Sequence, residues 1–138
     1  MRPTPILLDT CAAIWSSEMG GLSPAAVEAL DEAGQEGVPV LVSPITAWEM
    51  GMLVSRGRIA LLEPPMIWFA GLLESGVQLA DLSPSILVES SFLPQSRLRD
   101  PADKVIASTA RALGYRVMTR DRPLLDYAAM GHLKAIAC

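Results

Sequence analysis

Short apolar runs alternate along the chain with amphipathic segments of helical length. The apolar runs are aliphatic throughout and do not alternate with polar residues, which is typical of strands in a parallel sheet covered on both faces by helices. They predict strands at 5–8, 38–42, 77–82 and 115–119, with a fifth at 133–137. Strands separated by helices indicate an α/β fold.

Serine or aspartate followed directly by proline marks most of the helix starts. A small polar residue caps the free N–H groups of the first turn, and proline fits the first helical position. These pairs predict helices over 24–36, 44–56 and 101–113, and a short helix from 84. Two further helices are expected, one from Pro64-Pro65 to about residue 75 and one beginning near Cys11.

Size and composition favour one domain over residues 1–138. The chain is 51% hydrophobic but only 5% aromatic, so its core is aliphatic. No apolar run approaches the roughly 20 residues of a membrane span, and Met1–Pro5 lacks the features of a signal peptide. Cys11 and Cys138 are too few for a disulfide framework and are expected to be buried thiols in a reducing cytosol. We therefore expect a cytoplasmic protein without a membrane segment.

Charge is distributed unevenly. The net charge is −4, and residues 1–55 hold seven acidic residues against one basic residue. Residues 97–122 hold seven basic residues against three acidic ones. The basic region permits a polyanion such as a nucleic acid to approach. An arginine-rich, solvated helix face explains the same distribution equally well.

Four acidic residues interrupt stretches that otherwise belong to the core. Asp9 and Asp121 directly follow predicted strands, Glu49 lies among apolar neighbours, and Asp103 precedes an apolar helical stripe. Burying a carboxylate is unfavourable unless hydrogen bonds or a cation compensate its charge. Oxygen ligands at the carboxyl ends of parallel strands suit Mg²⁺ or Mn²⁺.

Each acid also has a structural interpretation. Asp9 fits the N-cap of the next helix, although Thr10 fits it too, and Asp121 fits the N-cap of a segment containing Pro123. A lone glutamate such as Glu49 is more often a surface residue than a ligand. Asp100 precedes Pro101, so its main predicted role is the N-cap of the following helix, with only a supporting role in the metal site.

Four segments together resemble the motifs of PIN domains, best those of VapC-type toxin ribonucleases from toxin–antitoxin pairs. They are residues 7–10, 43–49, 99–107 and 119–121, and the resemblance extends from about Ile6 to Ala137. It implies a three-layer α/β/α fold with a central parallel sheet of four to five strands. One departure is Leu98, where many relatives carry histidine before Arg-Asp-Pro. His132 is the only histidine, and a role at the surface or in the core fits it better.

The resemblance implies an endoribonuclease that uses one or two Mg²⁺ or Mn²⁺ ions to activate water, leaving a 5′-phosphate and a 3′-hydroxyl. Asp9 and Asp103 are the expected direct ligands. Glu49 and Asp121 are expected to bind the metal through water or to support the direct ligands without touching the metal. Thr10 and Thr119 are expected to orient water or phosphate. The expected contacts to the RNA backbone are Arg99, Lys104, Arg120 and Arg122.

The resemblance also implies protein partners. Apolar residues beyond the needs of a small core would form a groove for the C-terminal segment of a VapB-like antitoxin, and a second face would form a homodimer. Core packing is the favoured explanation for most of these residues, and only the remainder would form the groove. They are Trp15, Met19, Leu22, Met66, Trp68, Phe69 and Leu72.

Three other classes of protein fit parts of the pattern. A receiver-type signalling domain needs an acidic pair after the first strand, where this chain has Asp9-Thr10. A haloacid-dehalogenase-like phosphatase needs a second aspartate at the position of Cys11. A catalytically inactive PIN-like module that binds RNA or protein has no such conflict, but the four retained acids favour an enzyme.

Overall fold

Five parallel strands form the central sheet, in the order β3-β2-β1-β4-β5. The computed structural model describes residues 4–19 and 21–138. The order reverses at β1, so that β1 and β4 are neighbours although more than a hundred residues separate them. The strands are β1 (Ile6–Leu8), β2 (Val40–Val42), β3 (Gln78–Leu79), β4 (Arg116–Thr119) and β5 (Lys134–Ala137).

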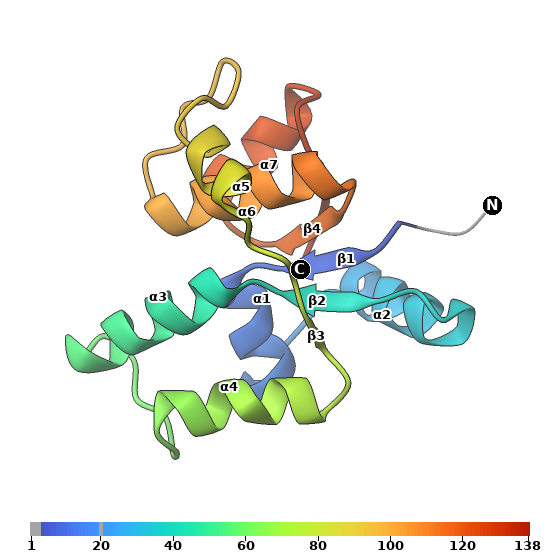
Figure 1. The fold of residues 1–138 in the computed structure, drawn as a ribbon. Coiled ribbons are helices and arrows are strands. Elements are labelled where there is room, and N and C mark those ends of the chain that lie inside the picture. Colours follow the sequence, from blue (N-terminus) through green and yellow to red (C-terminus); the bar gives the residue numbers. More distant parts are fainter. Residues whose placement is uncertain (1–3, 20) are drawn as a thin grey trace.

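Helices cover both faces of this sheet (Figure 1). Helices α1, α2 and α4 lie on one side, and α5, α6 and α7 lie on the other, while α3 contacts both α4 and α6. The helices are α1 (Thr10–Ile14), a π-helical turn η1 (Trp15–Met19), α2 (Pro24–Glu36), α3 (Pro44–Ser55), α4 (Pro65–Glu74), α5 (Pro84–Glu89), α6 (Pro101–Leu113) and α7 (Arg122–Ala129).

Strand β1 is buried on both faces. Ile6 and Leu8 pack into the core formed with α1, α2 and α4. Leu7 points the other way, into the core formed with α6 and α7. This arrangement confirms the predicted three-layer α/β/α fold and explains why the strand sequence is apolar without alternation.

The predicted helix caps are present. At each of these positions a side-chain oxygen accepts a hydrogen bond from a backbone N–H of the first turn, and proline follows at the first helical position. The capping residues are Ser23, Ser43, Ser83 and Asp100.

Three details differ from the sequence prediction. The strand expected at 77–82 is reduced to Gln78–Leu79, because it pairs only with β2 at the sheet edge and the chain soon turns into α5. The sequence predicts α7 only as a segment with Asp121 at its N-cap position, whereas the structure has a helix over Arg122–Ala129. Cys11 is exposed and Cys138 is partly exposed, so the expectation of two buried thiols is wrong.

The apolar residues of α4 divide between core and surface. Trp68, Phe69 and Leu72 are buried, which confirms core packing for them, whereas Met66 is 63% exposed. The side chain of Met19 lies outside the part of the structure that is described. Across residues 4–19 and 21–138, every helix is too short or too polar to cross a membrane.

Candidate active site

The junction between β1 and α1 fixes both oxygens of the Asp9 carboxylate. Asp9 is the N-cap of α1, and its Oδ1 accepts a hydrogen bond of 2.7 Å from the backbone N–H of Ala12. Its Oδ2 accepts a hydrogen bond from the Thr119 hydroxyl at the end of β4. The residue is almost completely buried. Burial raises the pKa of Asp9 to about 6, although these two hydrogen bonds act in the opposite direction.

At the junction between β4 and α7, the carboxylate of Asp121 accepts fewer hydrogen bonds than that of Asp9. Asp121 occupies the N-cap position of α7 but accepts no capping hydrogen bond. Its backbone N–H instead donates to the Thr119 hydroxyl at 2.9 Å. Among the described residues no group donates to its buried Oδ2. An unpaired buried oxygen of this kind is unusual and is free to accept a ligand.

Asp103 lies in the first turn of α6, where Asp100 accepts a hydrogen bond from its backbone N–H at 3.1 Å. The predicted N-cap role of Asp100 is therefore confirmed. Burial raises the pKa of Asp103 well above its usual range, and the carboxylates of Asp121, Asp100 and Asp9 raise it further. The Asp103 carboxylate therefore lies close enough to Asp9 and Asp121, the two acids at strand ends, for their charges to affect its pKa.

Glu49 approaches the same place from α3. Burial raises its pKa, and the Thr10 hydroxyl beside it partly offsets this effect. Thr10 is itself buried and exchanges a hydrogen bond of 3.0 Å with Thr46, one turn before Glu49 on α3. Sequence reasoning missed Thr46. The available signal was its position three residues before Glu49, on the same helical face.

Cys11 shows that the four acids share one location. Although the residue reaches the surface, the surrounding protein displaces enough water to raise the pKa of its thiol to about 12. The carboxylates of Asp9, Glu49, Asp121 and Asp103 all contribute to this increase, after burial. Four acids that are scattered along the sequence therefore lie around the first turn of α1, beside the point where the strand order reverses.

The donor set suits a divalent cation with several water ligands. Oxygen atoms are the ligands that Mg²⁺ and Mn²⁺ prefer, and the unpaired Oδ2 of Asp121 offers an acceptor for a water bound to such an ion. Within the described ranges, no three Asp, Glu, His or Cys side chains are already close enough to hold a metal ion among themselves. Since Mg²⁺ commonly keeps several waters and uses one or two carboxylates, this arrangement still fits such an ion.

Comparison with known proteins agrees with this geometry. Residues 6–130 match the PIN domain family. The chain belongs to the PIN domain family. Ribonuclease VapC22 of Mycobacterium tuberculosis is 36% identical over 125 residues, which cover 90% of this chain and 92% of that protein.

Solved structures share the fold of this PIN domain. A VapBC2 complex of Rickettsia felis bound to a DNA fragment from its promoter matches with a TM-score of 0.72 and 16% identity, over 98% of this chain and 99% of that one. A DNA-bound VapBC of Salmonella typhimurium matches with a TM-score of 0.66 and 16% identity, over 98% of each chain. At these identities the likeness concerns the fold alone.

The four basic residues predicted to contact RNA differ in the contacts that they already make within this PIN domain. Arg99 is exposed, and Arg122 is exposed with only a 3.5 Å ion pair to Asp126. Lys104 is partly buried on α6. Arg120 is engaged: its guanidinium lies 4.1 Å from the centre of the Trp15 ring and donates to the Gly21 carbonyl at 2.9 Å. Of the four predicted RNA contacts, Arg120 is therefore the one already used within the fold.

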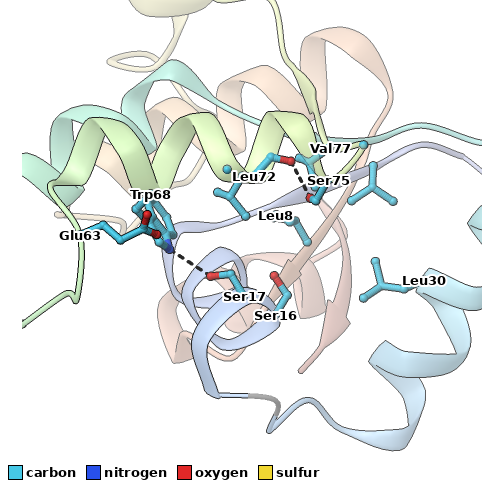
Figure 2. A pocket seen from close by; sticks show the side chains of 12 residues that line it. Leu8, Ser16, Ser17, Leu30, Glu63, Trp68, Leu72, Ser75 and Val77 are labelled. Atoms are coloured by element: carbon cyan, nitrogen blue, oxygen red, sulfur yellow. Dashed lines mark hydrogen bonds between the residues drawn. The ribbon is translucent and has the colours of Figure 1, made fainter.

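A separate groove of about 550 Å³ lies between α4, η1 and α2, and none of the four acids lines it. Figure 2 shows Leu8, Leu30 and Leu72 around it, together with Trp68, whose indole N–H donates to the Ser17 hydroxyl at 3.0 Å. It is a mixed apolar and hydroxyl-lined surface, distinct from the acidic site.

Proposed function

We propose that this PIN domain is the ribonuclease toxin of a toxin–antitoxin pair and cleaves RNA with Mg²⁺ or Mn²⁺. The observation that carries the proposal is the convergence of Asp9, Glu49, Asp103 and Asp121 around the start of α1. The ribonuclease named among its relatives supports the choice of RNA as substrate. We further propose a single domain over residues 1–138 and a cytoplasmic location, the compartment that holds such a substrate.

The residues of the chain prepare the site before any substrate arrives. The Ala12 N–H and the Thr119 hydroxyl hold Asp9 in one orientation, and burial keeps Asp103 and Glu49 poorly solvated. Asp9 and Asp103 are the proposed direct ligands, with Glu49 and Asp121 acting through water. When bound, a divalent cation supplies charge neutralisation at the phosphate and a lowered pKa of the attacking water.

Cationic side chains beside the acids favour binding of the phosphate backbone. We assign this role to Arg99 and Arg122, which are exposed, and to Lys104 on α6. Arg120 contributes positive potential from its place over Trp15. Ion pairing with phosphates releases counterions, so RNA affinity is expected to fall as the salt concentration rises.

The groove between α4 and η1 is the proposed site for a segment of a VapB-like antitoxin. Its apolar side chains suit apolar residues of such a segment, and Glu63 at its rim suits a basic one. The antitoxin complexes among the structural neighbours support a partner of this kind. We also propose a homodimer through the exposed apolar residues Leu87, Val88 and Phe92.

The test is cleavage of a labelled single-stranded RNA with Mg²⁺, with Mn²⁺ and with EDTA. The wild-type chain is expected to cut RNA only with a divalent ion. Asp9→Asn and Asp103→Asn are each expected to lower the rate by about 1000-fold, because each removes a charge that the ion requires. Asp31→Asn, an exposed aspartate on α2, is the matched control and should retain full activity.

Two results would contradict the proposal. Full cleavage by both substituted proteins would show that the acids are not the catalytic groups. No metal-dependent cleavage by a folded wild-type chain would favour the alternative of an inactive module that binds RNA or protein. Circular dichroism distinguishes this second result from simple misfolding.

A further inference from the structure

A second cavity adjoins the acidic site on its basic side. It has a volume of about 370 Å³ and lies between the segment that leads into α6 and the outer side of α7. Its lining combines apolar, cationic and acidic side chains. The lining residues are Arg97, Leu98, Pro123, Asp126, Tyr127 and Met130.

Both walls of this cavity continue directly from the acidic site. On one wall, Leu98 is followed two residues later by Asp100, the cap that positions the first turn of α6 and Asp103. On the other wall, Pro123 comes two residues after Asp121. Each wall of the cavity thus lies within two residues of the acidic site, a separation that the next nucleotide of a bound strand can span.

The cavity is rigid on its floor and adaptable at its rim. Leu98 and Tyr127 are buried, and the Tyr127 hydroxyl donates to the Pro94 carbonyl at 2.8 Å. At the rim, Met130 is 47% exposed and Arg97 is exposed. A flexible, polarizable methionine side chain fits flat apolar groups of different shapes.

The charge around the cavity selects a polyanion. Arg97 and Arg99 form no ion pair or side-chain hydrogen bond within the described ranges, so their guanidinium groups are available. Arg122 pairs with Asp126 at 3.5 Å, and Asp126 is the acidic residue among those that line the cavity. A cationic rim over an apolar floor matches a phosphate joined to a planar base.

We propose that this cavity binds one nucleotide of the RNA strand, beside the phosphate that is cleaved. The base contacts Leu98 and Met130, Arg97 binds a flanking phosphate, and Asp126 accepts a hydrogen bond from a base amino group. This inference rests on the proposed ribonuclease function and adds to it a subsite that discriminates among bases. Bases with an amino group are favoured there, because Asp126 can only accept hydrogen bonds when ionised.

The test separates the subsite from the acidic site by using two probes. Fluorescence anisotropy of a labelled single-stranded RNA in EDTA at low salt reports strand binding without cleavage. The rise in the thermal unfolding temperature on addition of Mn²⁺ reports the acids alone, because the bare ion has no group that enters the cavity. The variants are Arg97→Glu and Met130→Asp, with Arg58→Glu and Met66→Asp as exposed controls outside the cavity.

The two cavity variants are expected to bind the RNA about five- to ten-fold more weakly than the wild type. Arg97→Glu should also reduce the slope of log affinity against log salt by about 0.7, as expected for one lost phosphate contact on a single strand. Neither variant should change the stabilisation by Mn²⁺, and both controls should match the wild type on both probes.

Equal RNA affinity of the cavity variants and their controls, with the stabilisation by Mn²⁺ retained in the wild type, would overturn the subsite alone. A wild-type chain that shows no stabilisation by Mn²⁺ contradicts the proposed metal-dependent ribonuclease instead. The two failures are therefore distinguishable.

Discussion

The junctions that follow β1 and β4 have the same pattern in sequence and differ in chemistry. In each, an aspartate follows a buried strand and stands at the N-cap position of a helix. Asp9 has both carboxylate oxygens hydrogen-bonded, whereas Asp121 makes no capping bond and keeps a buried oxygen without a donor. One junction holds both oxygens of its carboxylate, and the other leaves one buried oxygen without a donor.

Thr119 is the residue that links the two junctions. Its hydroxyl accepts from the Asp121 N–H and donates to Asp9. Because a hydroxyl has one proton to donate, this arrangement commits that proton to Asp9 and none to Asp121. The difference between the two carboxylates therefore originates in one side chain at the end of β4.

Among changes that leave all four acids in place, the largest effect is expected from Thr119→Val, which removes both contacts at once. RNA cleavage should fall by about 100- to 1000-fold, because the orientation of Asp9 is lost. The free energy of unfolding should also fall by about 1–3 kcal/mol, since buried polar groups lose their partner. Cleavage kinetics and urea unfolding measure the two effects, and Thr119→Ser should recover most of both.

Thr109→Val is the matched control for this change. Thr109 is also fully buried, but its hydroxyl donates to the Val105 carbonyl within α6. It should retain wild-type cleavage. Equal losses of activity in Thr109→Val and Thr119→Val would mean that Thr119 has no special role in the site.

The next effect concerns the pH dependence of stability at Asp9. Its pKa in the folded state is raised from 3.8 to about 6, so the folded protein binds the proton more tightly than the unfolded chain. Its contribution is therefore most favourable below pH about 4 and is lost as pH rises to about 6, a change of about 3 kcal/mol. The free energy of unfolding, measured with urea in EDTA, should no longer show this part of the decline with pH in Asp9→Asn.

The exposed Asp31→Asn should keep the wild-type slope over the same pH range. Because Asp103 and Glu49 also have raised pKa values, the informative quantity is the difference between wild type and Asp9→Asn. Identical curves for these two proteins would refute the strong burial of the Asp9 charge.

A comparable or smaller effect is expected from added Mn²⁺. An ion that binds only the folded state raises its stability by about 2.7 kcal/mol at 100 times the dissociation constant. Asp121→Asn should weaken this stabilisation, because it replaces a free carboxylate with a neutral amide. Thermal unfolding with and without Mn²⁺ measures it, independently of cleavage, and an undiminished shift would exclude Asp121 from the site.

The smallest effect separates two arginines at the β4–α7 junction. Arg120→Ala should lower stability by about 1–2 kcal/mol, because it loses contact with the Trp15 ring and a backbone carbonyl. Arg122→Ala should change stability by less than about 0.5 kcal/mol, since its ion pair is exposed. Arg122→Ala should instead weaken RNA binding. If Arg122→Ala lowered stability and Arg120→Ala weakened RNA binding, the roles assigned to the two arginines would be wrong.

The features that the sequence predicted are those with a local cause. Serine or aspartate before proline places a helix start through hydrogen bonds within one turn, as at Ser23 and Asp100. Strands buried on both faces, such as β1, are apolar throughout and indicate a parallel sheet directly. The sequence also predicted a site at the four acids, because a carboxylate among apolar neighbours is unfavourable without compensation.

The features that the sequence could not predict depend on distant partners. Thr119 donates to a residue 110 positions away, and Arg120 stacks on a ring that precedes it by about the same distance. The short β3 reflects its place at the sheet edge, which a run of apolar residues does not reveal. Likewise, Cys11 looked buried from its neighbours but reaches the surface at the start of α1.

The adjacency of β1 and β4 also has a consequence for synthesis and folding. The hydrogen bond between Asp9 and Thr119 closes a loop of 110 residues, and β1 can pair with β4 only after the whole intervening segment from α2 to α6 has been made. A contact between residues so far apart in sequence carries a large loop-closure entropy, which slows folding. The acidic site therefore requires that the chain be synthesised through Thr119, and we expect its assembly to be among the slow steps of folding.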